Sequence, residues 1–210
     1  LEIEESVESS VLGNYITPLS AAYFGDSYYI AVKSLYASND AMSWEEASLS
    51  GSADDYPYVL ELSVFNSYLY GLFYAEGDYD QEEDPSIVLL RSADGSAFTE
   101  AATFSGSPVH LFVENGILFV CLSSDSTYSM VYSTDGTTFT SVSLETLSQP
   151  VFDSAYDGAN YWFVTESAVY RGTSPASLSK ESSFEVRHVG GIVYSGINNA
   201  VFVSGSQSGQ

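Results

Sequence analysis

The chain has 210 residues, enough for one all-β domain with a sizeable core, and 45% of its residues are hydrophobic. It carries 28 carboxylates against five Lys and Arg residues, a formal net charge of −23 at pH 7. Nucleic acids and anionic membranes are bound through clusters of Lys and Arg, so this charge argues against both kinds of partner. No run of about 18 apolar residues predicts a membrane-spanning segment. We expect no nucleic-acid binding and no membrane insertion.

Short hairpins of apolar and aromatic residues recur along the chain, each closed by a turn of Gly, Asn or Asp residues. In chain order they occupy 23–30, 64–70, 111–119, 155–163 and 192–202. Such turns tolerate a positive φ and reverse the chain, while the β-branched and aromatic flanks favour strands. No segment shows helical periodicity. The pattern predicts an all-β chain.

A second repeat, with a period of about 40 residues, places the same polar turn after three of these hairpins. The copies are Ser38–Asp40–Trp44, Ser92–Asp94–Phe98 and Ser133–Asp135–Phe139. In each copy we expect the Asp to accept hydrogen bonds from backbone N–H groups and the Ser to cap the other side of the turn. The aromatic ring of each copy should be buried between sheets. A degraded fourth copy contains Gly172, Ser174 and Leu178.

The two repeats together predict the blades of a β-propeller, each with four antiparallel strands. The blades are expected at about 19–52, 56–105, 108–146 and 150–186, with an incomplete fifth at 188–203. An N-terminal strand within 1–12 would complete the fifth blade and remove the exposed edges of the ring. Residues 1–210 would then form a single five-bladed domain. The alternative is that the chain is a fragment of a longer propeller.

The polar turns resemble the Asp-box (BNR-like) repeats of sialidase-type, sortilin-type and related bacterial secreted propellers. The resemblance covers most of residues 30–180, with two departures from the usual box. Gly95 and Gly136 directly follow the Asp, and the aromatic residue comes one position early. In that family the boxes lie on the face away from any active site. The resemblance therefore implies that the three Asp residues are structural.

The resemblance does not extend to a sialidase active site. Sialidases of this kind hold the carboxylate of the substrate with three Arg residues, and this chain has three in total. Arg91 and Arg171 lie beside the polar turns, toward the wrong face. No sialidase activity is expected, and no catalytic residue is assigned.

One loop, at 76–85 in the second blade, is longer than its counterparts. It holds hard oxygen ligands of the kind that Ca²⁺ prefers at alternate positions, namely Asp78, Asp80, Glu82 and Asp84. The fixed Gly and the distant bidentate Glu of an EF-hand are missing. The loop is interpreted either as a solvated acidic loop or as a Ca²⁺ site. No other cofactor is expected.

This loop should lie on the face opposite the polar turns, which is where propellers commonly carry function. The other candidates for a ligand-binding face are Asp54, Asp55, Tyr56, Tyr58, Tyr79, His110, Arg187 and His188. Both histidines precede an innermost strand, which predicts positions near the mouth of the central channel, either as functional groups or as hydrogen-bonded packing residues. Arg187 could pair with a carboxylate of a ligand.

Composition also bears on localisation. Few Lys residues together with many Ser, Asp and Tyr residues favour a secreted or cell-surface prokaryotic protein. Cys121 is the single cysteine, so no internal disulfide forms, and its apolar surroundings predict a small buried side chain.

Two functional classes remain. One is a non-catalytic extracellular or cell-surface module that binds a glycan or a protein through the Tyr-rich face. The other is a glycoside hydrolase that uses paired carboxylates. The absence of a Ser/His/Asp signature and of a phosphate-binding loop favours the first. Its partner should be neutral or cationic, because an anion would approach a strongly negative surface.

Overall fold

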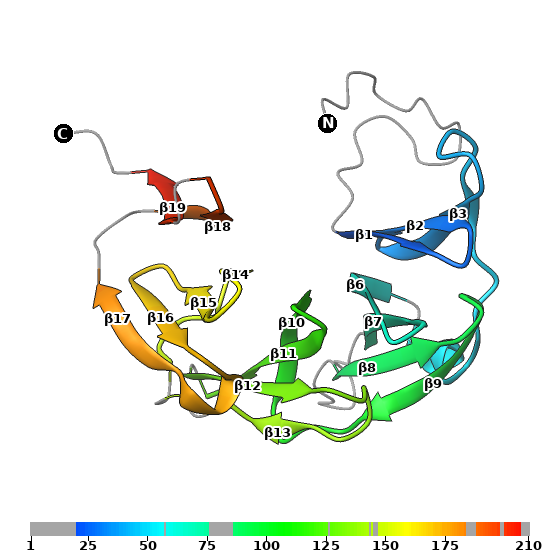
Figure 1. Ribbon diagram of the computed structural model, residues 1–210. Helices are drawn as coiled ribbons and strands as arrows, with labels where there is room; N and C mark the ends of the chain where they lie inside the picture. The colour runs from blue at the N-terminus through cyan, green and yellow to red at the C-terminus, as the bar shows by residue number, and fades with distance from the viewer. Residues whose placement is uncertain are drawn as a thin grey trace. The chain divides into compact units, whose positions relative to one another are not determined.

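The computed structural model describes residues 20–56, 58–75, 86–125, 127–142, 144, 147–183, 188–197 and 200–206. Within these ranges the chain is made of β-strands and two short 3-10 helices (Figure 1). It divides into two compact units, Leu1–Thr103 and Phe104–Gln210.

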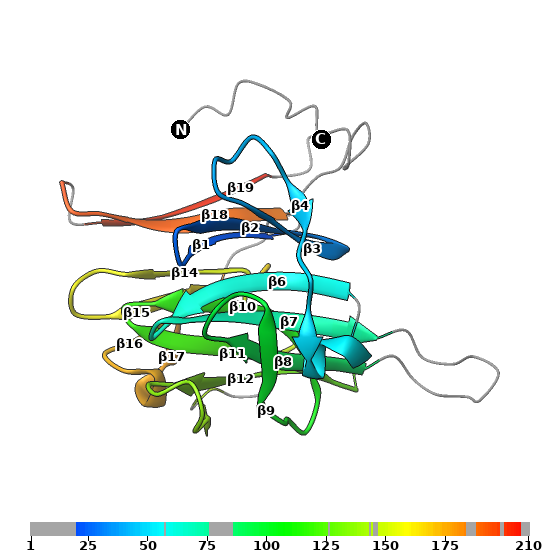
Figure 2. The same ribbon diagram turned by 90° about the vertical axis from the view of Figure 1, so that its right-hand side faces the viewer.

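The first unit contains two sheets. The first sheet holds β1 (Ser20–Phe24), β2 (Ser27–Val32), β3 (Ser34–Ser38) and β4 (Glu45–Glu46), hydrogen-bonded in chain order. The second holds β6 (Tyr58–Phe65), β7 (Tyr68–Ala75), β8 (Ser86–Ser92) and β9 (Ala97–Ala102), with β5 (Ser50–Gly51) parallel to β9. The 3-10 helix η1 (Ser52–Asp55) connects β5 to β6. Figure 2 shows β6, β7 and β8 running alongside one another.

The position of β5 corrects one predicted boundary. Residues up to 52 were expected to belong to the first blade, yet Ser50 and Gly51 pair with β9 of the second sheet. Gly51 makes this possible, since a side chain there would collide with the carbonyl oxygen of Phe98. Its φ of 75° also lies in the left-handed region that glycine adopts readily.

The second unit contains three sheets. The third sheet holds β10 (Ser107–Glu114), β11 (Ile117–Ser124), β12 (Thr127–Ser133) and β13 (Thr140–Ser141). The fourth holds β14 (Asp153–Tyr156), β15 (Tyr161–Val164), β16 (Ala168–Gly172) and β17 (Ser179–Ser183), with the 3-10 helix η3 (Pro175–Ser177) before β17. The fifth has two strands, β18 (His188–Ser195) and β19 (Ala200–Ser206).

These sheets confirm the prediction of an all-β chain built from four-stranded antiparallel blades. The N-terminal strand expected within 1–12 lies outside the described residues. Closure of a five-bladed ring and the single-domain organisation therefore stay predictions.

The hairpin turns share one backbone geometry. Both central residues have a positive φ between 47° and 69° in Gly25–Asp26, Asn66–Ser67 and Asn115–Gly116. A two-residue turn of this kind matches the right-handed twist of the flanking strands, which explains the recurrent Gly, Asn and Asp residues.

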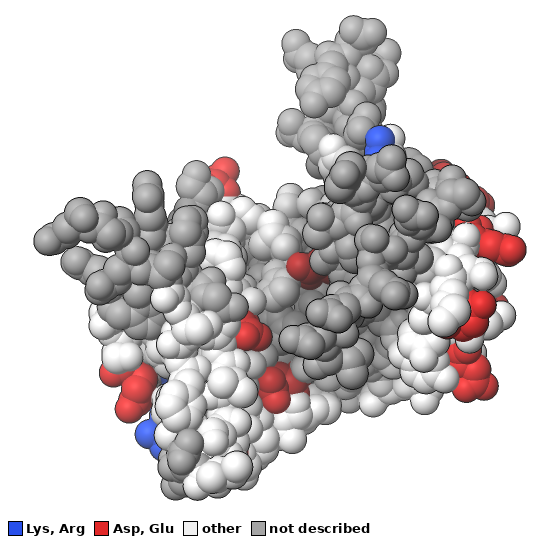
Figure 3. Space-filling model, turned by 90° about the horizontal axis from the view of Figure 1, so that it is seen from above, with Lys and Arg blue, Asp and Glu red and all other residues white. Residues whose placement is uncertain are grey.

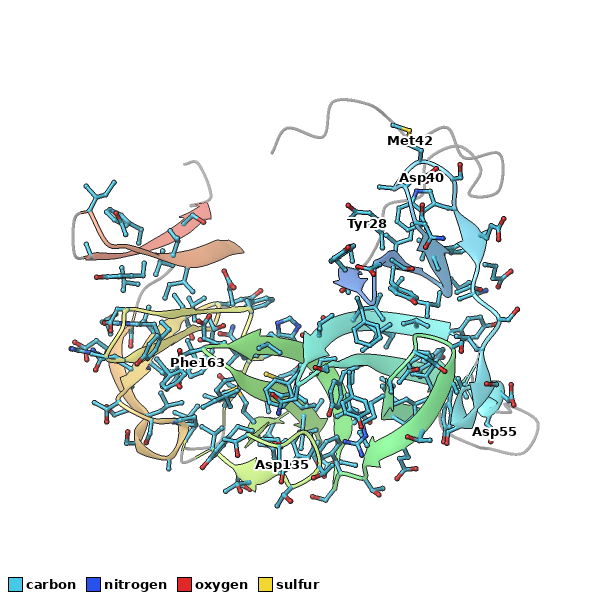
Figure 4. All side chains as sticks on the ribbon, turned by 45° about the vertical axis from the view of Figure 1, so that its right-hand side comes forward. Tyr28, Asp40, Met42, Asp55, Asp135 and Phe163 are labelled. Atoms are coloured by element: carbon cyan, nitrogen blue, oxygen red, sulfur yellow. The ribbon has the colours of Figure 1, made fainter. Side chains whose placement is uncertain are left out.

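Each unit has its own apolar core. The two sheets of the first unit pack around Leu35, Phe73 and Phe98, all fully buried. In the second unit the third and fourth sheets pack around a cluster that includes Phe119 and Phe163, the latter labelled in Figure 4. Cys121 is 1% exposed within this cluster, so the expected packing role is confirmed.

Candidate functional site

The three polar turns share one hydrogen-bond pattern. The Ser hydroxyl donates to Oδ1 of the Asp two residues on, at 2.9 Å for Ser38, 2.9 Å for Ser92 and 3.0 Å for Ser133. The same Oδ1 accepts the backbone N–H groups two and three residues after the Asp, at 2.7–2.9 Å. In each turn, Oδ1 of the Asp therefore accepts at least three hydrogen bonds from within a six-residue segment.

These bonds act on the pKa of each Asp carboxyl. Backbone N–H groups of Ser43 and Met42, with the Ser38 hydroxyl, lower the pKa of Asp40 from 3.8 to about 2. The backbone bonds at Asp94 and Asp135 lower the pKa of those carboxyls still further. Figure 4 shows Asp40 and Met42 in the same loop. The three carboxylates are ionised at neutral pH and are engaged within their own turns, which is a structural role.

Burial of the aromatic residue differs among the turns. Phe98 is fully buried, as expected, but Trp44 and Phe139 are only half-buried, so the prediction is wrong for those two. Phe98 lies inside the six-residue strand β9, which β5 covers. Trp44 and Phe139 instead precede the two-residue strands β4 and β13, which lie at the edges of their sheets.

The degraded fourth turn replaces the carboxylate by a short helix. Gly172 pairs with Tyr161 at the place where Ser133 pairs with Leu118 in the third sheet. The Ser174 and Ser177 side chains cap η3 reciprocally. A Cβ on Gly172 would lie 2.6 Å from the Ser177 carbonyl oxygen, so only glycine fits. The fourth turn therefore occupies the same position in its sheet as the other three, but serine side chains take the role of the Asp carboxylate.

At the end of the second sheet opposite its polar turn, aromatic rings and a Lys side chain lie together. There β6 begins at Tyr58 and β7 ends just beyond Tyr74, and these two residues pair, with ring centroids 5.8 Å apart. The ammonium nitrogen of Lys33 lies 4.6 Å from the centroid of the Tyr58 ring. We call Lys33, Tyr58 and Tyr74 the Tyr58 cluster. Tyr58 was a predicted site residue, whereas Lys33 and Tyr74 were not.

Lys33 has an unusual backbone for a long side chain. It is the single residue between β2 and β3, and its φ of 74° is left-handed. Its carbonyl oxygen accepts the Val59 N–H at 2.7 Å, which ties this connection to β6. A non-glycine residue held in this conformation is uncommon and more frequent near functional sites.

The other predicted residues of this unit lie nearby in the chain. Asp54 and Asp55 are exposed on η1, while Ala53 between them and β5 is buried in the core. Figure 4 shows Asp55 at the outer edge of its unit. Tyr56 is half-buried and packs against the core.

In the second unit, His110 lies inside β10 rather than before an innermost strand, which corrects that prediction. It pairs with Cys121 and its ring lies 5.2 Å from that of Phe112. This half-buried packing favours the structural interpretation of His110. His188 begins β18, but its side chain is outside the described residues.

Several predicted site residues lie wholly outside the described residues, namely Asp78, Tyr79, Asp80, Glu82, Asp84 and Arg187. The Ca²⁺ site in the acidic loop therefore stays a prediction. Among the residues that are described, no group of three or more His, Cys, Asp or Glu side chains could hold a metal ion.

The structure also brings together a carboxylate pair that the sequence did not indicate. The Ser154 hydroxyl donates to Glu114 Oε2 at 3.2 Å, linking β14 to β10. The neighbouring Asp153 accepts the backbone N–H groups of Ser154 at 2.8 Å and of Ile192 at 2.9 Å. Burial raises the pKa of Glu114, and the charge of Asp153 adds to the rise.

Most of the described cations cover aromatic rings. Besides Lys33 over Tyr58, Arg91 lies 4.8 Å from the Tyr68 ring and Arg171 lies 4.9 Å from the Trp162 ring. Acidic side chains are the more frequent kind on the face drawn in Figure 3. These three cations interact with aromatic rings. The other charged side chains are mostly acidic, so the surface is negative.

A groove of about 450 Å³ lies beside the first polar turn. Its lining includes Asn39, Asp40 and Glu45. Because the Asp40 carboxylate is already engaged within its turn, we attach no function to this groove.

Solved structures of other proteins resemble this chain in fold, although their sequences differ widely from it. No protein-family model and no curated protein matches the chain. The extracellular domain of BT4673 from B. thetaiotaomicron is 11% identical, with a TM-score of 0.59 over 89% of this chain and 26% of that one. An exo-β-1,3-galactanase from Phanerochaete chrysosporium is 12% identical, with a TM-score of 0.55 over 85% and 52%. Regucalcin, a calcium-binding protein from Agrobacterium tumefaciens, is 14% identical, with a TM-score of 0.54 over 89% and 67%.

These similarities confirm the predicted β-propeller fold class. The chain spans less than two thirds of the length of the first two proteins. The matched proteins include both an extracellular domain and an enzyme, so the fold does not choose between binding and catalysis. Among the described residues, no helix is long and apolar enough to cross a membrane.

Proposed function

We propose that the chain is an Asp-box-like propeller of the secreted or cell-surface class that binds a glycan or a protein without catalytic turnover. Its binding surface lies at the end of the second sheet opposite the polar turn of that sheet. The observation that carries this proposal is the Tyr58 cluster, in which two half-buried rings and an exposed Lys lie together at that end. Tyrosine rings bury large apolar area and keep a polar tip, which suits recognition of sugars and of protein side chains.

Two further points support the proposal. In the polar turns, Oδ1 of each Asp accepts hydrogen bonds from within the turn, which supports a structural role for that end and recognition at the other. The matched BT4673 domain is extracellular. In the first unit, the predicted partner surface also includes Asp54 and Asp55, which are exposed.

A glycan array probed with the wild-type chain and two matched variants tests this proposal. Tyr58→Leu removes a ring at the proposed surface. Tyr68→Leu removes a ring that is also half-buried and covered by a cation, but at the polar-turn end. Any glycan signal should be lost in the first variant and kept in the second. A signal that survives Tyr58→Leu and is lost in Tyr68→Leu would contradict the placement of the site.

A Ca²⁺ site in the loop at 76–85 is part of the proposal. Asp78, Asp80, Glu82 and Asp84 would bind the ion, which would relieve repulsion among them and raise stability by mass action. The matched regucalcin is described as calcium-binding. Calorimetry with CaCl₂ should show a binding heat that Asp80→Asn with Asp84→Asn abolishes. A melting temperature indifferent to both Ca²⁺ and EDTA would leave a solvated loop.

The carboxylate pair supports a second candidate, a glycoside hydrolase. A half-buried carboxyl with a raised pKa beside a second carboxyl is an arrangement from which a general acid can work. Against this, both oxygens of Asp153 accept backbone N–H groups, and a Cβ on Gly191 would lie 2.9 Å from Oδ2. Hydrolysis of a panel of nitrophenyl glycosides, abolished by Glu114→Gln, would establish the enzyme and overturn the non-catalytic proposal.

A further inference from the structure

The interaction between Lys33 and Tyr58 shows what the Tyr58 ring can accept. An ammonium within about 6 Å of a ring centroid is attracted by the negative face of the ring. Lys33 Nζ lies at 4.6 Å, so the ring already holds an ammonium group. Tyr74 stands beside it, with the two ring planes tilted by 33°. Tyr58 therefore supplies the face that holds the cation, and Tyr74 packs against Tyr58.

The contact between Lys33 and Tyr58 is weak enough for another cation to replace Lys33. Lys33 is exposed, and at exposed positions cation–π contacts are weak. Its ammonium therefore can leave the ring at small cost, while the Val59 N–H still holds the backbone of the connection. A second ammonium of the same chemistry could take its place.

Arg91 over Tyr68 provides an internal contrast. Arg91 lies within β8, where its backbone pairs with Tyr70 on one side and Thr99 on the other. The Arg91 side chain therefore extends from a strand that has a neighbouring strand on each side. Lys33 starts from a one-residue connection with a left-handed backbone, outside any regular strand. Lys33 is exposed and Arg91 is half-buried, so the contact at Tyr58 is the more accessible of these two cation–π contacts.

Charge indicates which partner would replace it. The chain carries a formal net charge of −23, and Asp54 and Asp55, just upstream of Tyr58, are exposed. Such a surface attracts cations and accelerates their association. A protein segment with an exposed lysine supplies the same ammonium that Lys33 supplies now.

We propose that Tyr58 and Tyr74 form a binding site for a lysine side chain of a protein partner, and that Lys33 occupies this site in the free protein. This inference rests on the proposed binding function and names its ligand class. Lys33 then acts as an intramolecular competitor. Because an occupied site lowers the apparent affinity, removing Lys33 should strengthen binding.

The test uses a blocked tripeptide, acetyl-Gly-Lys-Gly-amide, titrated into the isotopically labelled chain and followed by NMR. Lys33→Ala should bind the peptide about two- to five-fold more tightly than the wild type, as expected from the strength of an exposed cation–π contact. Lys180→Ala is the matched control, because it removes an equally charged, exposed Lys from β17 of the other unit. Its affinity should stay close to that of the wild type.

Ring variants complete the test. Tyr58→Phe should retain binding, since the aromatic face persists, whereas Tyr58→Leu should lose it while its melting temperature shows that it is folded. The peptide with an acetylated lysine should not bind. Equal affinities in Lys33→Ala and Lys180→Ala, or equal binding of the acetylated peptide, would overturn the inference. If a glycan signal depends on Tyr58 while the lysine peptide fails to bind, the proposed function stands and this inference falls.

Discussion

The two ends of the second sheet differ in how they use polar and aromatic groups. At the end with the polar turn, Ser92 is 1% exposed and its hydroxyl, together with the Asp94 carboxylate, is engaged within the turn. At the other end, the Tyr58 cluster is held by one cation–π contact and one contact between half-buried rings. The first arrangement is held by hydrogen bonds within the turn, whereas the second is held by contacts that a ligand could replace. We therefore expect stability to depend on the polar-turn end of the sheet and recognition to depend on the Tyr58 cluster.

The largest effect should come from the buried ring at the polar-turn end. Phe98 is fully buried and its ring centroid lies 4.8 Å from that of Phe73. Phe98→Ala should lower the free energy of unfolding by about 3–5 kcal/mol in urea denaturation. Tyr58→Leu should lower it by about 1 kcal/mol or less. Equal losses at the two positions would remove the distinction between the ends.

A smaller effect is expected from the buried hydroxyl of the same turn. Ser92 Oγ accepts the N–H groups of Asp94 at 3.3 Å and Gly95 at 2.9 Å. Ser92→Ala leaves both without this acceptor and should cost about 1–3 kcal/mol. Ser129→Ala, at an exposed strand position, should change the free energy by about 0.5 kcal/mol or less. A neutral Ser92→Ala would show that the turn is not held by this bond.

The pH dependence of stability sharpens the comparison further. The pKa of Asp40 is about 2 in the folded chain against an ordinary value of 3.8. A lowered pKa stabilises the fold above the ordinary value, and this contribution is lost as the pH falls from about 4 to about 2. The gap in melting temperature between the wild type and Asp40→Asn should therefore narrow over this range. A gap that is constant from pH 5 to pH 2 would contradict the lowered pKa.

Local signals explain which parts of the structure the sequence could predict. Each polar turn is complete within five residues of its Ser, and each two-residue hairpin turn depends on residues that tolerate a positive φ. Such features do not depend on how sheets pack. The four-stranded antiparallel sheets could be predicted from these features, whereas the pairing of Ser50–Gly51 with β9 could not, because it depends on a close approach that only Gly51 allows.

The Tyr58 cluster depends on a feature that is not local. Counting back from the Phe65–Tyr68 pair would place Ala75 opposite Tyr58, but a bulge between Val59 and Glu61 shifts the register so that Tyr74 faces it. Lys33 reaches the same place from another sheet through its left-handed backbone. The bond between Ser154 and Glu114 likewise joins two sheets. Contacts of this kind depend on packing between blades, which the repeat pattern does not encode.

The most direct test of the separation compares Asp94→Ala and Tyr58→Leu in parallel. For each variant the melting temperature is recorded together with binding to the lysine tripeptide and to the glycan array. We predict that Asp94→Ala lowers the melting temperature and leaves binding unchanged, whereas Tyr58→Leu abolishes binding with little change in melting temperature. Loss of binding in Asp94→Ala at an unchanged melting temperature would contradict the account.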